Sequence, residues 1–141
     1  MKVNRLNVRA ARFGGGDWTE NPDWRAVEEG IEKIRSTTGM VEIFAADDVS
    51  IAISSEQGKY FLVLGFSGNK QYVLIDNRQP VPSKSEFVLP IDGNECLEHN
   101  TIIDLNDVVT MAEDFSNTGG FNDSDPYTWV DLNSDTTRFS Y

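Results

Sequence analysis

Apolar residues recur along this chain at two spacings, one typical of helices and one typical of strands. The helical spacing occurs late in the chain, in residues 103–118, and again early, in residues 21–37. Between these two stretches the spacing changes to two, as in half-buried strands. The pattern therefore predicts an early helix, a run of strands and a late helix.

The late helix has the clearest signals at both ends. Its apolar stripe consists of Leu105, Val108, Val109, Ala112 and Phe115. Asp104 is placed to cap the free amides of the first turn, and Asp107 puts a second negative charge near the positive end of the helix dipole. Gly119 and Gly120 allow the left-handed conformation that ends helices. We expect an acidic loop at residues 122–126 and an extended piece at residues 127–132 to follow.

The early helix is predicted over residues 21–37. We expect Asn21 to cap it and Pro22 to occupy its first turn, where the missing N–H is not needed. The apolar stripe consists of Trp24, Val27, Ile31 and Ile34, so Trp24 is predicted to lie in the core. Gly30 disfavours the helix by about 1 kcal/mol relative to Ala. Its presence predicts that the helix packs closely on a sheet.

Four segments with a period of two are predicted to form a meander of antiparallel strands. They cover residues 40–46, 49–55, 60–66 and 71–75, and the separators between them are short enough for hairpins. A further strand is expected within residues 3–13, before a flexible break at residues 14–17. One or two more short strands are expected at residues 87–91 and 96–103, after a surface connection at residues 78–85.

These elements predict a single α+β domain over residues 1–141. Both amphipathic helices need an apolar surface, and the sheet offers the only large one. We therefore expect an antiparallel sheet of about six strands, with a central meander and with both helices packed on one face. On the opposite face we expect partly uncovered aromatic side chains, with Tyr60, Phe66 and Tyr72 as the candidates.

Composition agrees with one folded domain. The chain has 141 residues, of which 39% are apolar, including eight Phe, four Tyr and three Trp. No apolar run approaches the roughly 18 residues of a membrane span, and residues 1–13 are too polar for a signal peptide. The single cysteine, Cys96, excludes an internal disulfide. We expect a cytoplasmic protein that does not bind membranes.

The negative charge is concentrated in one part of the chain. Acidic and basic residues balance in residues 1–84, whereas residues 85–141 hold twelve acids and one arginine, a net charge of −11 that equals the charge of the whole chain. Such a segment repels nucleic acid and attracts basic proteins over long distances. This asymmetry predicts a basic protein partner and no direct binding of nucleic acid. Acids that merely keep the protein soluble are the simpler alternative.

The sequence holds little catalytic chemistry. His99 is the only histidine, and on a strand it would point away from Cys96, three residues earlier. Residues 122–125 have the residue types of a calcium loop but not its spacing or its closing Glu. We therefore predict a protein that is not an enzyme and that uses no cofactor and no metal. An enzyme that acts on a small substrate through carboxylates stays open as a third hypothesis.

The end of the late helix and the segment after it resemble a known family. The pattern consists of Phe115, Thr118, Gly119, Pro126, Trp129 and Leu132. It is similar to the C-terminal pattern of the Imm1 family of bacterial immunity proteins, which are encoded beside polymorphic toxins. The resemblance implies one-to-one binding of a cognate toxin, without cofactor or turnover. It implies no catalytic residue and no particular contact residue.

The leading hypothesis is therefore an immunity protein that occludes the basic substrate cleft of a toxin. The favoured toxin is a nucleic-acid deaminase, such as a cytosine deaminase, and the alternative is a nuclease. A general protein- or peptide-binding scaffold of a secretion or regulatory system is the competing hypothesis. Charge and loop position select the predicted partner contacts, which are Asp92, Glu95, Glu98, Asp123, Asp125 and Tyr127. Phe121 is a second candidate aromatic anchor, and Trp129 is expected in the core.

Overall fold

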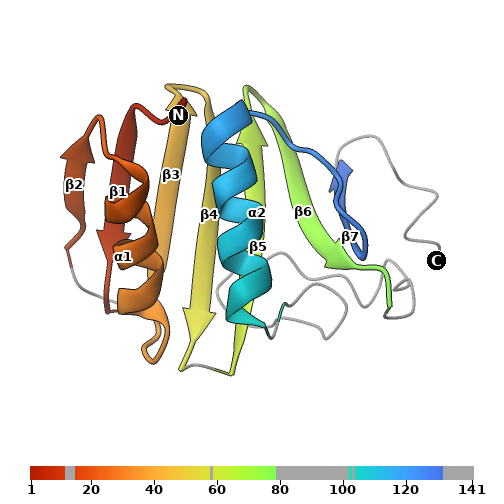
Figure 1. The fold of residues 1–141 in the computed structure, drawn as a ribbon, viewed down its shortest axis with the longest axis horizontal. Helices are drawn as coiled ribbons and strands as arrows, with labels where there is room; N and C mark the ends of the chain where they lie inside the picture. The colour runs from red at the N-terminus through yellow and green to blue at the C-terminus, as the bar shows by residue number, and fades with distance from the viewer. Residues whose placement is uncertain (12–14, 58, 79–101, 103, 132–141) are drawn as a thin grey trace.

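The computed structural model describes residues 1–11, 15–57, 59–78, 102 and 104–131. These residues form one seven-stranded antiparallel sheet and two helices, in the strand order β2-β1-β3-β4-β5-β6-β7 (Figure 1). In chain order the elements are β1 (Arg5–Arg9), β2 (Asp17–Glu20), α1 (Trp24–Ile34), β3 (Met40–Ala46), β4 (Val49–Glu56), β5 (Tyr60–Ser67), β6 (Lys70–Asp76), α2 (Leu105–Thr118) and β7 (Tyr127–Asp131).

Both helices lie on the same face of the sheet (Figure 1). α1 crosses β1 and β3, and α2 lies beside it over the middle of the sheet. The predicted α+β architecture, with two helices on one face and a central meander from β3 to β6, is confirmed. The predicted strands 87–91 and 96–103 lie outside the described residues, except for Ile102, which exchanges two backbone hydrogen bonds of 2.8 Å with Phe61.

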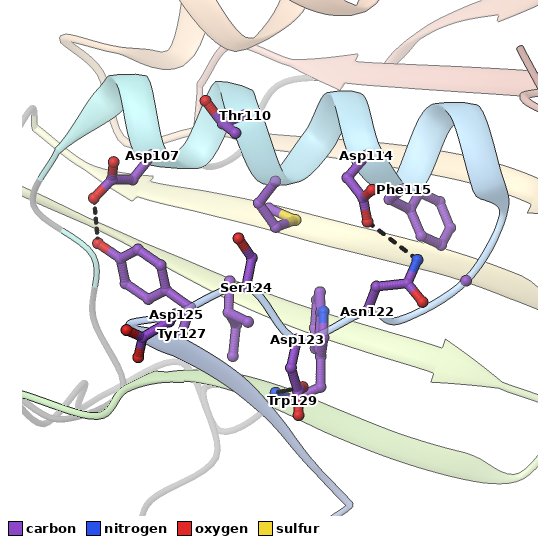
Figure 2. Close-up of a pocket in the computed structure, with 13 residues that line it drawn as sticks. Asp107, Thr110, Asp114, Phe115, Asn122, Asp123, Ser124, Asp125, Tyr127 and Trp129 are labelled. Atoms are coloured by element: carbon purple, nitrogen blue, oxygen red, sulfur yellow. Dashed lines mark hydrogen bonds between the residues drawn. The ribbon is translucent and has the colours of Figure 1, made fainter.

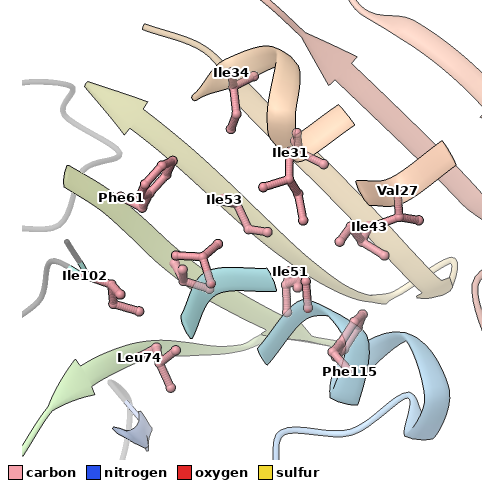
Figure 3. Close-up of a cluster of buried hydrophobic side chains, with 14 of the residues drawn as sticks. Val27, Ile31, Ile34, Ile43, Ile51, Ile53, Phe61, Leu74, Ile102 and Phe115 are labelled. Carbon is pink, nitrogen blue, oxygen red and sulfur yellow. The ribbon is translucent and has the colours of Figure 1, made fainter. Parts of the chain in front are cut away.

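The main core fills the space between the helices and the sheet, and Figure 3 shows its central side chains. Every second residue of β3 and β4 contributes, as alternation along a strand requires. From the helices, Ile31 and Phe115 are almost completely buried. Gly30 of α1 also faces the sheet, where a Cβ atom would lie 2.7 Å from the side chain of Val8. The close packing predicted from this glycine is confirmed.

The start of α1 differs from the prediction. Asp23, and not Asn21, is the N-cap, and its carboxylate accepts a hydrogen bond of 2.9 Å from the Ala26 amide. The Asn21 amide instead donates to the Asn4 carbonyl, which continues the pairing of β2 with β1. The missed strand β2 thus displaces the helix start by two residues. Pro22 precedes the cap and is not in the first turn.

Both predicted ends of α2 are confirmed. The Asp104 carboxylate accepts a hydrogen bond of 2.8 Å from the Asn106 amide, and Asp107 lies in the first turn. At the other end Gly119 has a φ of 71°, and its amide donates to the Phe115 carbonyl. Residues with β-carbons rarely adopt this conformation, so the glycine ends the helix and turns the chain back along it.

The face without helices is only partly as predicted. Phe66 is partly buried there, beside a second buried cluster that consists of Leu62, Leu64, Val73, Ile75 and Val130. Tyr72 was assigned to the wrong face. It shares the helix-covered face with Leu74, two residues along the same strand, and its ring stacks on Phe121.

Candidate functional site

A cavity of about 360 Å³ lies between α2, the loop that follows it and the adjoining strands. A volume of this size is within the range of small-ligand pockets. Figure 2 shows its lining from the side of the helix and the loop. α2 contributes Asp107, Thr110, Met111, Asp114 and Phe115. The loop contributes Gly120 and residues 122–125, and the strands contribute Leu74, Tyr127 and Trp129.

The helix side of the cavity follows from spacing along α2. Asp107, Thr110 and Asp114 are three and four residues apart, so they project from one side of the helix. This polar stripe runs beside the buried stripe of Val108, Ala112 and Phe115. The helix therefore packs on the sheet with one side and presents two carboxylates to the cavity with the next, as Figure 2 shows.

Hydrogen bonds hold the loop against the helix. The Asn122 side-chain amide donates to the Asp114 carboxylate and to the Thr118 hydroxyl, each over 3.1 Å. Ser124 and Tyr127 exchange two backbone hydrogen bonds, which close a turn. The Asp123 carboxylate accepts a hydrogen bond of 2.9 Å from the Trp129 amide. These contacts place the acids of the loop opposite those of the helix.

The aromatic side chains of Phe115 and Trp129 line the cavity, and Phe121, which does not line it, packs on both. Phe121 packs edge to face with Trp129, with 5.1 Å between ring centroids, and lies 5.6 Å from Phe115. Its ring also lies on Gly65 of β5, where a Cβ atom would approach the ring to 2.4 Å. A glycine at this position of the strand thus allows the ring to pack directly on the backbone. Phe115 and Trp129 therefore give the cavity an apolar wall beside its acidic residues.

Tyr127 links the cavity to the edge of the sheet. Its hydroxyl donates to the Asp107 carboxylate over 2.5 Å and accepts a hydrogen bond of 3.3 Å from Arg78. Burial and the neighbouring Asp107 carboxylate raise the pKa of this phenol above its usual range. The hydrogen bonds from Arg78 lower the pKa of Asp76, the carboxylate on which Arg78 is anchored. This chain of polar groups connects β6, β7 and α2.

Four carboxylates surround the cavity, namely those of Asp107, Asp114, Asp123 and Asp125. In the part of the chain that the structure describes, no lysine or arginine forms an ion pair with any of them. Arg78 reaches Asp107 only through the Tyr127 hydroxyl. Within the described residues, the cavity therefore combines carboxylates that have no ion-pair partner with an apolar aromatic wall, a combination that suits the long, cationic side chains of lysine and arginine.

Three of the predicted contact residues meet at this cavity. Asp123, Asp125 and Tyr127 all line it. The Tyr127 side chain is buried, and its hydroxyl group connects β7 to Asp107 of α2. The predicted contacts Asp92, Glu95 and Glu98 lie outside the described residues. Trp129 is partly buried against the core, as expected, and also lines the cavity.

Sequence reasoning missed Asp107 and Asp114 as site residues. Asp107 was interpreted only as a charge near the positive end of the helix dipole, and Asp114 was not among the predicted contacts. Their separation of seven residues, which places them on one side of a helix, is the signal that identifies them. The sequence alone does not say that the loop folds back onto this side.

Across the described ranges, no three side chains of His, Cys, Asp or Glu are grouped so that they could hold a metal ion. Neither of the two described helices is long and apolar enough to cross a membrane.

Comparison with known proteins gives no relative. No family model, no curated protein and no solved structure matches this chain. The resemblance to the Imm1 family therefore depends only on the residues quoted above.

Proposed function

We propose that this chain is an immunity protein that binds a basic toxin one to one and blocks its substrate cleft. The observation that carries the proposal is the cavity, where four carboxylates face an aromatic wall. A toxin that acts on nucleic acid needs lysine and arginine side chains in its cleft to hold phosphates. Such side chains are complementary to this cavity in charge.

The binding energy would come from a few buried contacts. A toxin lysine or arginine that enters the cavity packs its aliphatic stem near Met111 and Trp129 and directs its charge to Asp114 and Asp123. The hydrogen bonds within the loop hold these acids in place before binding, which reduces the entropy lost on association. The proposed toxin is a nucleic-acid deaminase, with a nuclease as the alternative, and the resemblance to the Imm1 family supports this choice.

Coexpression tests the function directly. The toxin to use is the domain encoded by the reading frame upstream of the gene for this chain. Cells that express this domain should survive only when the chain is present, and the two purified proteins should form a one-to-one complex. Unchanged survival together with no complex on mixing would contradict the immunity function.

A matched pair of variants tests the role of the cavity. Asp114→Asn with Asp125→Asn removes two charges from the cavity, whereas Glu28→Gln with Glu29→Gln removes two from the exposed surface of α1. The cavity variant should lose about tenfold or more in affinity for the toxin, and the α1 variant should change it far less. Equal losses would show that only the net charge matters. Association should also slow as ionic strength rises.

A further inference from the structure

We propose that the outer edge of β2 is a second interaction surface, which pairs with an extended basic segment of a protein partner. β2 and β7 are the first and last strands of the sheet, so this surface lies at the opposite end from the cavity. The inference does not depend on the proposed function.

The backbone of β2 has hydrogen-bonding groups that point away from the sheet. Asn21 donates to the Asn4 carbonyl, and the register pairs Thr19 with Leu6 and Trp18 with Asn7. Because bonded and non-bonded pairs alternate in an antiparallel ladder, Thr19 bonds to β1, and the N–H and C=O groups of Trp18 and Glu20 face outward. No strand among the described residues pairs with this edge, and all four residues of β2 are exposed.

Trp18 supplies an apolar anchor beside these groups. Its side chain is 54% exposed, and it is the most exposed aromatic residue in the described part of the chain. The ring is nevertheless held in position. Phe44 lies 5.8 Å away between centroids, and the Arg5 guanidinium lies 5.4 Å from the Trp18 ring and 4.8 Å from the Phe44 ring. A preordered, half-exposed tryptophan is typical of the residues that dominate binding energy.

The charges of β2 select a basic partner. Asp17 and Glu20 give this strand two negative charges and no positive one. A second copy of the chain, paired edge to edge, would place four carboxylates on one short ladder, and like charges on facing strands destabilise each other. Side chains alternate along β2, so Trp18 and Glu20 lie on one face and Asp17 lies on the other. A strand that alternates lysine or arginine with β-branched residues can therefore offer an apolar side chain to Trp18 on one face and a cation to Asp17 on the other. This mode of binding is strand addition to an exposed sheet edge.

Amide hydrogen exchange with a synthetic probe tests the pairing. The probe is an eight-residue peptide that alternates lysine and valine, and its glutamate-valine counterpart is the control. In the free protein, the Thr19 amide should exchange slowly and those of Trp18 and Glu20 fast. Addition of the lysine peptide should slow exchange at Trp18 and Glu20 by about tenfold or more, whereas the glutamate peptide should leave it unchanged.

Variants separate backbone pairing from attraction by charge. Glu20→Pro removes an outward N–H while it leaves the Thr19 bond to β1 in place, and Glu20→Gln removes only the charge. The proline variant should lose the protection at Trp18, and the glutamine variant should keep most of it. Trp18→Ala should weaken peptide binding about tenfold. This last variant decides the test if Glu20→Pro loses the slow exchange at Thr19.

Three results would overturn the inference. The first is fast exchange at Trp18 and Glu20 with the lysine peptide in excess. The second is equal protection by both peptides. The third is unchanged binding to Trp18→Ala. The double variant Asp114→Asn with Asp125→Asn should still show the protection, since the cavity is not involved. The proposal for the edge of β2 and the proposal for the cavity can therefore be contradicted independently of each other.

Discussion

The two helices lie side by side on one sheet, yet their outer surfaces differ. On α1, Arg25 pairs with Glu29 over 3.1 Å and Arg35 at the C-cap pairs with Glu32 over 2.9 Å. α2 contains no lysine or arginine and carries Asp107, Glu113 and Asp114. The exposed charges of α1 largely balance, while those of α2 do not.

The two helices also differ in what their exposed sides contact. α1 approaches the sheet closely through Gly30, and its exposed side chains find partners on the same helix. α2 buries one side equally well but leaves its acidic side to a cavity that the following loop closes. Asp107 and Asp114 each accept a hydrogen bond, from Tyr127 and Asn122, but neither forms an ion pair with a lysine or arginine among the described residues. Such a group of like charges is a feature that a basic partner would complement.

The largest expected effect concerns the common core. Phe115→Ala and Ile31→Ala each remove a nearly fully buried side chain from beneath one helix. The first should lower the free energy of unfolding by about 3–5 kcal/mol and the second by about 2–5 kcal/mol. Urea denaturation measures both. A loss below about 1 kcal/mol for Phe115→Ala alone would mean that α2 is not anchored as firmly as α1.

A smaller effect is expected at Tyr127, whose hydroxyl ties α2 to β7. Tyr127→Phe keeps the ring but removes the hydrogen bond to Asp107, and should lower the free energy of unfolding at pH 7 by about 1–2 kcal/mol. Chemical denaturation of both proteins measures this difference. No counterpart of this bond ties α1 to the sheet among the hydrogen bonds of the described residues.

The same variant has a characteristic pH dependence. Since folding raises the pKa of Tyr127, its contribution is fully present below the unfolded value of about 10 and is lost as pH rises through the folded pKa. The stability difference between wild type and Tyr127→Phe should therefore shrink above about pH 10. A constant difference from pH 7 to pH 11 would contradict this account.

The smallest effect concerns the caps, in which the two helices are alike. Asp23→Ala and Asp104→Ala each remove a carboxylate that accepts a hydrogen bond from a first-turn amide. Each should lower the free energy of unfolding by about 1 kcal/mol. Thermal and urea denaturation measure the two losses. If only one cap matters, the helices differ in local stability as well as in charge.

The prediction of local features succeeded where neighbours in sequence decide the structure. The cap at Asp104 and the end at Gly119 depend on residues within one turn, and both were found. The cap of α1 was misplaced because Asn21 pairs with Asn4, which is 17 positions away in sequence. The face of Tyr72 was misassigned because the parity of a strand relative to the helices depends on the whole sheet.

The candidate site was predicted in the same partial way. Charge and position selected Asp123 and Asp125, because an acidic loop after a helix is visible in the sequence. Asp123 and Asp125 line the same cavity as Asp107 and Asp114 because the chain reverses at Gly119 and because Asn122 donates a hydrogen bond to Asp114. The spacing of residues in the sequence does not predict whether the loop folds back onto the helix.

By itself, the sequence determined the helices, the meander and the excess of acid in the second half, because periodicity and charge are properties of neighbouring residues. Only the tertiary structure decided that β2 forms one edge of the sheet, that Trp18 stays exposed there, and that acids from a helix and a loop surround one cavity. These features arise from contacts between residues far apart in the chain. Local propensity carries no information about such distances.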